Sequence, residues 1–294
     1  MDPNSILIEK ILSKQKPGGY WCEPENFYVY TKYKGTVWTV ILLAELGASG
    51  EDQLTKDACE FLLTWSQHRE SGGFAFHDNP ENGGEADCII PCLTGNMVYS
   101  LIRLGMLEDP RVQKGIDWIT RYQRFDDGEC KAPKGFPYKS EHCWGKHTCM
   151  TGVVTTLRAL AEIPAQHRSP QVRKTIIQAV EFILIHRLFR RSHDPSQVAN
   201  PYWLKLGWPH MANIDILEML SILQKLGVQD QRMIPALEKL VEMRGKDGFW
   251  INQNAREGRM QVRVEKEGEP SPRITQMAVS VLNFTSEFFP GRKK

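Results

Sequence analysis

In two short segments of this sequence, cysteine and histidine residues are spaced as metal ligands often are. Cys88 and Cys92 are four residues apart, and so are Cys143 and His147. On a helix, residues with this spacing lie on the same face. Three thiolates and one imidazole suit a tetrahedral zinc ion. The two segments therefore predict a zinc site, if the fold brings them together.

Other assignments of these thiols remain open. Cys149 lies near Cys143 in the sequence and can replace it as a ligand, and the four cysteines of this region could instead hold an iron–sulfur cluster. Pro91 favours the first position of a helix, which would leave Cys88 in the preceding loop. Cysteines without a metal are small buried hydrophobic residues, and we expect this role for Cys22, Cys59 and Cys130.

Two further residues are candidates for acid–base catalysis. His210 follows Trp208-Pro209 before a predicted helix, where it could transfer protons, bind a ligand or simply pack at the helix start. Asp87 stands directly before Cys88. Aromatic residues near the apolar helices could line a ligand cavity and stabilise a carbocation, or only fill the core. They are Tyr33, Trp38, Tyr99, Trp144 and Trp208.

A turn pattern that recurs about every 55–60 residues organises the chain around these candidates. A glutamine at the end of one helical stretch is followed by a glycine-rich turn and an aromatic residue. The copies are Gln15–Trp21, Gln67–Phe74, Gln123–Gly128 and, without its glutamine, Asp247–Trp250. A degenerate copy surrounds Leu188. Glycine pairs and Asp-Gly typically end helices and form tight turns.

Each turn separates an amphipathic helix from a more apolar one. The amphipathic helices are predicted over 54–67, 112–123, 172–186 and 233–243. The apolar helices are predicted over 37–46, 97–104, 153–163, 216–226 and 274–289. A helix that is apolar around its circumference is buried on all sides.

These patterns predict an all-α fold. We expect residues 1–294 to form a single α/α-toroid (barrel) domain of about five helical hairpins, with outer and inner rings of helices around a central cavity. The starts of neighbouring inner helices would then converge, which would bring the cysteine and histidine segments together. Alternation in 260–264 predicts a short strand or hairpin.

Composition indicates an ordinary globular protein. Hydrophobic residues make up 41% of 294 residues, enough for a sizeable core, and charged residues make up 24%. A net charge of +2 gives no reason to expect a nucleic-acid partner. Neither a signal peptide nor a membrane-spanning apolar run is evident, so we expect a cytoplasmic protein with reduced thiols.

The repeats resemble those of the α/α-toroid superfamily of squalene-type terpene cyclases and protein prenyltransferase β subunits. Gln15-X-X-X-Gly19-X-Trp21 matches the glutamine-to-tryptophan repeat of the cyclases, and Gly72-Gly73-Phe74 matches a prenyltransferase turn. The resemblance covers nearly the whole chain and implies a toroid. The Asp-X-Asp-Asp motif that carries the cyclase proton donor is missing from this sequence.

The prenyltransferase resemblance implies a catalytic zinc held by an aspartate, a cysteine and a histidine. Asp87-Cys88 and His147-Thr148-Cys149 match the segments that carry these ligands. In that family one residue separates the aspartate from the cysteine, whereas Asp87 and Cys88 are adjacent. Cys143-Trp144-Gly145 also resembles an element of the lanthionine cyclases, another zinc-binding toroid family.

The function expected from the sequence is that of a prenyltransferase- or terpene cyclase-like protein. Its central cavity would bind an apolar, isoprenoid-type small molecule, with zinc at the cavity mouth on Cys88, Cys92, Cys143 and His147. One alternative is a non-catalytic binding or scaffold toroid with a structural metal or none. A second is a carbohydrate-active barrel, for which Asp87 and Asp215 would be the two carboxylates.

Overall fold

The computed structural model describes residues 2–28, 32–79, 81–128, 138, 141–211, 213–256 and 258–287, and this part of the chain is largely helical, as predicted. Cys130 and Phe289 lie outside the described residues. The chain forms two compact units, Met1–Gln178 with Gly258–Arg263 and Ala179–Glu257 with Val264–Lys294. Closure of the hairpins into a ring stays a prediction.

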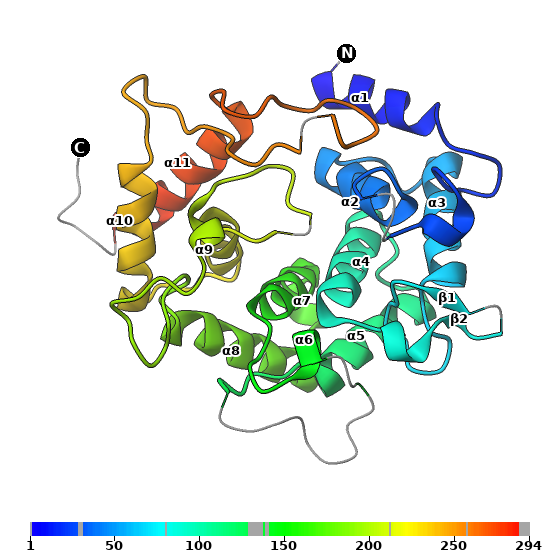
Figure 1. The fold of residues 1–294 in the computed structure, drawn as a ribbon, viewed down its shortest axis with the longest axis horizontal. Helices are drawn as coiled ribbons and strands as arrows, with labels where there is room; N and C mark the ends of the chain where they lie inside the picture. Colours follow the sequence, from blue (N-terminus) through cyan, green and yellow to red (C-terminus); the bar gives the residue numbers. More distant parts are fainter. Residues whose placement is uncertain are drawn as a thin grey trace. The chain divides into compact units, whose positions relative to one another are not determined.

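The first unit holds the helices of the first three hairpins (Figure 1). They are α1 (Pro3–Leu12), α2 (Thr36–Leu46), α3 (Gln53–Trp65), α4 (Pro91–Arg103), α5 (Pro110–Tyr122), α6 (Glu141–Trp144) and α7 (Met150–Glu162), together with the start of α8 (Pro170–Ile185). A short antiparallel pair, β1 (Asp78–Asn79) and β2 (Gly83–Gly84), and the 3₁₀ helix η2 (Ala86–Cys88) precede α4. Two further 3₁₀ helices are η1 (Pro24–Asn26) and η3 (Ala165–His167).

The second unit holds the end of α8 and the remaining described helices. They are α9 (Ile216–Lys225), α10 (Ile234–Glu242) and α11 (Pro272–Ser286), with the 3₁₀ helices η4 (Pro201–Leu204) and η5 (Gln231–Met233). The strand or hairpin predicted over 260–264 was wrong, because residues 260–262 form bends and 263–264 have no regular structure. An alternating pattern makes a strand only where a partner strand pairs with its backbone. Here Gln261 instead donates from its side chain to the Lys34 carbonyl, at 2.7 Å.

The predicted helices are confirmed, with shifted ends. The largest shift is in α4, which begins at Pro91 instead of at 97. Proline favours the first helical turn because its fixed backbone angle suits a helix and its missing N–H would have no partner there. Burial separates the two predicted helix types. Every residue of α2 is buried, whereas α5 buries one face.

The glutamine and glycine of the first repeat turn join it to the next amphipathic helix. The Gln15 side chain donates to the Leu54 carbonyl in α3, at 2.8 Å. A Cβ on Gly19, whose φ is +85°, would lie 2.2 Å from the Asp57 carbonyl oxygen. The second turn repeats both contacts on α5, from Gln67 to the Arg111 carbonyl and from Gly72 to Lys114. The recurring motif is therefore a connection between consecutive hairpins.

The aromatic residue of each turn ties it to its own hairpin. The Trp21 indole donates to the Ile11 carbonyl at the end of α1, at 3.0 Å, and the Trp250 indole donates to Leu240 in α10, at 2.7 Å. A threonine at the start of the following helix accepts from the backbone N–H of the aromatic residue. These pairs are Trp21–Thr36, Phe74–Thr94 and Trp250–Thr275.

Helices α4 and α7 approach each other closely. A Cβ on Gly95 would lie 2.6 Å from the backbone of Thr155, and one on Gly152 would lie 2.9 Å from the Pro91 ring. Because Pro91 faces Gly152 and Gly95 faces Thr155, the two helices run parallel. Their starts therefore lie side by side (Figure 1).

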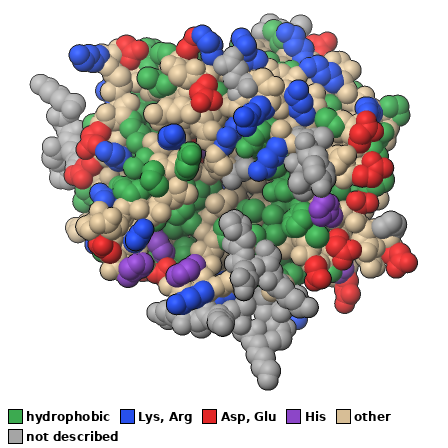
Figure 2. Space-filling model, viewed as in Figure 1, with side chains coloured by type: hydrophobic (Ala, Val, Ile, Leu, Met, Phe, Trp, Pro, Cys, Tyr) green, Lys and Arg blue, Asp and Glu red, His purple; other side chains and the backbone are tan. Residues whose placement is uncertain are grey.

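The face drawn in Figure 2 carries basic, acidic and hydrophobic side chains together. Such a mixture is ordinary for a folded protein surface. Among the described residues, no helix combines the length and the apolarity needed to cross a bilayer.

Candidate functional site

Aromatic side chains gather beside the start of α2 in the first unit. The Tyr28 ring stacks on Trp38 with 4.9 Å between centroids, and the Trp38 indole donates to the Tyr28 carbonyl at 2.9 Å. Tyr33 meets Trp38 edge-on at 5.2 Å, and Phe76 lies 6.3 Å from Tyr28. Trp38 and Tyr33 are buried, whereas Tyr28 and Phe76 are half-buried. The group is therefore apolar and partly open to solvent.

Three thiols lie near these rings at the starts of α4 and α7. Cys92 is the second residue of α4, Cys149 is the N-cap of α7 and Cys143 belongs to α6. Each is half-buried. The predicted convergence of inner-helix starts is thus confirmed for α4 and α7. We call the combined group the aromatic–thiol cluster; it consists of Tyr28, Tyr33, Trp38, Phe76, Cys92, Cys143 and Cys149.

Two acidic groups of this cluster, Cys92 and Tyr28, have raised pKa values. Burial raises the pKa of Cys92, and the nearby Cys149 and Cys143 raise it further. Burial also raises the pKa of Tyr28, with smaller contributions from Cys92 and Cys143. A buried thiol or phenol loses more solvation on ionising than a free one. Cys92 and Tyr28 therefore stay protonated at neutral pH.

In neither predicted pair, Cys88–Cys92 or Cys143–His147, do both residues lie on one helix. The expectation that each pair shares a helix face was therefore wrong. Cys88 ends η2, and α4 begins only at Pro91, so Cys88 and Cys92 are on different elements. Helix α6 ends at Trp144, before His147. A spacing of four residues places two side chains on one face only when one helix continues through both.

The other predicted ligands lie in their own surroundings. Cys88 is half-buried, and its pKa is raised by burial and then by Glu85 and Asp87, whose side chains surround it with negative charge. Asp87 itself is exposed. The exposed His147 ring lies against Gly128, where a Cβ would come within 2.4 Å of its Nδ1.

A zinc ion does not fit these residues as they lie. Within the described ranges, no three histidine, cysteine, aspartate or glutamate side chains are arranged to hold a metal ion. The ligand set of Cys88, Cys92, Cys143 and His147 stays a prediction, and no chemical step is derived through a metal.

Comparisons with known proteins give the fold alone. A crystal structure of a protein from Actinoplanes matches 96% of this chain and 75% of its own, with 14% identity and a TM-score of 0.51. The two proteins share a fold. The type II terpene cyclase MstE from Scytonema, in complex with its substrate geranylgeranyl dihydroxybenzoate, covers 97% of each chain at 15% identity, with a TM-score of only 0.34. No family model matches the sequence, and no curated protein does.

Two of the predicted ligand-binding aromatics have other roles in the first unit. Trp144 is buried, stacks on Tyr138 at 5.1 Å and meets Trp118 at 5.8 Å, which is core packing. The Tyr99 hydroxyl donates to Glu45 at 2.9 Å, away from solvent. Neither position by itself indicates a ligand.

Tyr99 belongs to a buried charged network that the sequence analysis missed. Arg158 in α7 lies 3.3 Å from the Glu45 carboxylate in α2 and donates to Asn96 in α4 at 2.6 Å. Its guanidinium carbon is 4.1 Å from the Tyr99 ring centroid. Burial and the Glu45 charge raise the pKa of Tyr99, so it remains a hydrogen-bond donor. We call Glu45, Asn96, Tyr99 and Arg158 the buried ionic network.

A sequence signal for this network was present. Glu45 and Arg158 are charged residues within helices that are otherwise apolar. A charge on a fully buried helix is costly unless it is paired. The two residues could therefore have been predicted as partners.

The predicted catalytic His210 lies in the second unit. Its Nε2 is 3.6 Å from the Asp215 carboxylate, and both side chains are buried. Asp215 caps α9, since it accepts the N–H of Glu218 at 2.9 Å and that of Gly207 at 2.9 Å. The cavity lined by His210 and Asp215 has a volume of about 10 Å³, which is room for a single water molecule.

Trp208 also belongs to this region of the second unit. It exchanges hydrogen bonds with Asn252, donating to the side-chain oxygen at 3.4 Å and accepting at its own carbonyl at 2.8 Å. The geometry around His210 thus holds a loop against the start of α9. Acid–base catalysis by His210 or Asp87, and ligand binding by Trp208, stay predictions.

Proposed function

We propose that this protein binds an apolar, isoprenoid-type molecule at the aromatic–thiol cluster. The observation that carries the proposal is the stack of the half-buried Tyr28 on the buried Trp38 at 4.9 Å, with Phe76 beside Tyr28 and thiols within electrostatic reach. Small-molecule sites are typically lined by apolar and aromatic side chains with few polar groups. The cluster has this composition.

The neutral state of the cluster favours binding of an uncharged hydrocarbon chain. Raised pKa values keep Cys92 and Tyr28 protonated, so neither brings a charge that an apolar ligand would have to desolvate. The half-buried rings of Tyr28 and Phe76 would also stabilise a cationic carbon on the ligand. The cluster contains no carboxylic acid to create such a cation, so the proposal is binding, with catalysis left to experiment.

Equilibrium dialysis with farnesol tests the proposal directly. We expect saturable binding by the wild-type protein and about tenfold weaker binding by Tyr28→Ala, because an aromatic contact contributes about 0.5–1.5 kcal/mol beyond its buried area. Tyr202→Ala is the matched control, because Tyr202 is 64% exposed and lies in η4 of the second unit. Its affinity should equal that of the wild type.

Two results would count against the proposal. If the wild-type protein binds no farnesol, the proposal is wrong. That outcome favours the alternative of a scaffold without a small-molecule ligand. Equal affinity in Tyr28→Ala and Tyr202→Ala would place the ligand elsewhere. Circular dichroism of both variants establishes that each is folded.

Zinc is tested separately by measuring the metal content of the purified protein. About one zinc per chain, lost in a Cys92→Ser variant, would confirm the predicted ligand set. A wild-type protein without zinc that still binds farnesol would leave the ligand proposal standing and remove the metal from it.

A further inference from the structure

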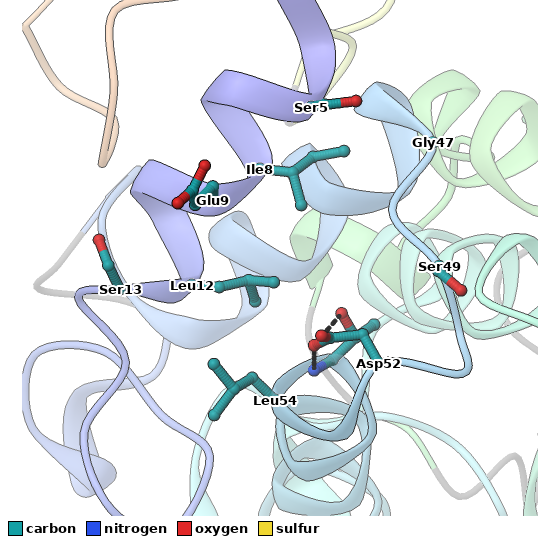
Figure 3. A pocket seen from close by; sticks show the side chains of 10 residues that line it. Ser5, Ile8, Glu9, Leu12, Ser13, Gly47, Ser49, Asp52 and Leu54 are labelled. Carbon is teal, nitrogen blue, oxygen red and sulfur yellow. Dashed lines mark hydrogen bonds between the residues drawn. The ribbon is translucent and has the colours of Figure 1, made fainter. Parts of the chain in front are cut away.

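A cleft of about 530 Å³ opens in the first unit between α1, the end of α2 and the start of α3 (Figure 3). Its apolar lining comes from Ile8 and Leu12 on α1 and Leu54 on α3. Glu9 and Asp52 line it as well, and the lining residues that the structure describes include no basic side chain. Leu54 is 42% exposed. The cleft is therefore lined by apolar side chains together with one carboxylate from α1 and one from the start of α3.

In the next pair of amphipathic helices, α3 and α5, an arginine side chain occupies the place that corresponds to this cleft. Asp109 caps α5, and Arg111 pairs with it at 2.7 Å. The same guanidinium pairs with Glu60 on α3, with contacts of 2.7 and 2.9 Å. The hydrogen bond from Arg111 lowers the pKa of Asp109. An arginine side chain thus bridges the two helices.

The pair α8 and α10 repeats this arrangement in the second unit. Arg232 pairs with Asp230 at 2.8 Å and with Glu181 on α8 at 2.7 Å. The pKa of Asp230 is likewise lowered by its hydrogen bond with Arg232. Two independent copies therefore place a guanidinium beside the aspartate that caps the helix start.

In the pair α1 and α3, the aspartate remains but the arginine does not. Asp52 caps α3 through the Thr55 N–H, at 3.0 Å. Leu54 takes the position of Arg111, because the carbonyl of each accepts from the glutamine of the preceding turn. Ile8 takes the position of Glu60, since it precedes Gln15 by the same distance as Glu60 precedes Gln67. The cleft occurs where both clamp residues have become apolar.

We propose that this cleft is a binding site for an organic cation, an ammonium or guanidinium group on an alkyl chain. The cationic group would lie beside Asp52, because an arginine lies beside the corresponding aspartate in the two other helix pairs. The alkyl chain would cover Ile8 and Leu54, whose partly exposed surface gains from removal from water, above the buried Leu12. A volume of about 530 Å³ is in the range of small-molecule sites. This site is independent of the aromatic–thiol cluster.

Three eight-carbon probes that differ only in the head group test the charge preference by isothermal titration calorimetry at pH 7. We expect n-octylamine to bind about threefold more tightly than n-octanol and n-octanoate to bind most weakly, because exposed charge pairs contribute a few tenths to one kcal/mol. An Asp52→Asn/Glu9→Gln variant keeps a good helix cap at residue 52. It should bind octylamine and octanol equally.

An Ile8→Glu/Leu54→Arg variant rebuilds the clamp of the other helix pairs inside the cleft. It should lose octylamine binding, because the built-in arginine occupies the site. The control is Val241→Arg, which places an arginine on a 43% exposed valine of α10 and should leave binding unchanged. Equal affinity for the three probes in the wild type, or full octylamine binding by the rebuilt clamp, would overturn the proposal. Farnesol binding in the same variants reports separately on the aromatic–thiol cluster.

Discussion

The aromatic–thiol cluster and the buried ionic network, both in the first unit, use polar groups in opposite ways. Near the helix starts, Tyr28 and Cys92 are half-buried, and burial raises the pKa of both. Further along the same helices, Glu45 and Arg158 are charged, almost fully buried and paired with each other. Paired buried charges specify how helices pack, whereas a neutral, partly open surface is available to a ligand. The comparison therefore distinguishes a structural region from the region that we propose to bind a ligand.

Breaking the buried ionic network should have the largest effect. Arg158→Met leaves the Glu45 carboxylate buried without its guanidinium. We expect a loss of about 3–5 kcal/mol in the free energy of unfolding, as is typical when one partner of a buried ion pair is removed. Urea denaturation followed by circular dichroism measures it.

The matched control removes both charges. Glu45→Gln/Arg158→Met should recover much of the lost stability, because no unpaired charge remains. A single Arg158→Met variant as stable as the wild type would contradict a structural role for the network.

Separating α4 from α7 should have the next largest effect. Gly95→Ala places a Cβ within 2.6 Å of the Thr155 backbone, which cannot move without shifting the helix. We expect a loss of about 1–3 kcal/mol in unfolding free energy and weaker farnesol binding, because the helix starts that hold Cys92 and Cys149 would move apart.

Gly115→Ala is the control for this change. A Cβ there would come closest to the Val98 side chain, at 2.8 Å, which can adjust more easily than a backbone. Its loss of stability should be smaller, and farnesol binding should not change. Equal losses in the two variants would mean that the close approach of α4 and α7 is not decisive.

The smallest expected effect is on how the alkylation rate of Cys92 depends on pH. Iodoacetamide reacts with thiolates, so an ordinary thiol of pKa 9.0 reaches nearly its full rate a little above that pH. Since the folded-state pKa of Cys92 is raised, its alkylation should remain slow at pH 9 and continue to accelerate above it. Mass spectrometry of tryptic peptides, with N-acetylcysteine as the reference, measures the rate.

The same shift predicts how stability depends on pH. A thiol that holds its proton more tightly in the folded state stabilises the protein below the unfolded-state value of 9.0, and this contribution declines as the pH rises above it. Cys92→Ala should therefore lose less stability than the wild type between pH 8 and 10. An ordinary pH–rate profile for Cys92 would show that burial does not control its ionisation.

Local patterns in the sequence were sufficient to predict the helices and their turns. The apolar run from Val37 to Leu46 predicted a buried helix, and all of α2 is buried. Pro91 indicated that Cys88 lies before α4, as it does. Such features depend on neighbours along the chain, so short stretches of sequence contain the needed information.

The candidate site was harder to predict because its parts come from separate elements. Tyr28 follows η1 in a segment without helical periodicity, and nothing local indicates that it stacks on Trp38. The pairs Cys88–Cys92 and Cys143–His147 were expected on common helices, but helix boundaries fall within both. A shift of boundary by a few residues redirects a side chain completely.

By itself, the sequence determined that this chain is largely helical, where its helices change from amphipathic to apolar, and that Gln15, Gln67 and their turns repeat. Only the tertiary structure decided that Arg158 meets Glu45 and that Cys92 lies near Cys149. It also decided that Leu54 borders a cleft, whereas Arg111, at the corresponding position of the next helix pair, forms an ion pair with Glu60. The reason is physical. Helix formation follows from local hydrogen bonds and periodic burial, whereas contacts between helices depend on how closely residues such as Gly95 let distant backbones approach.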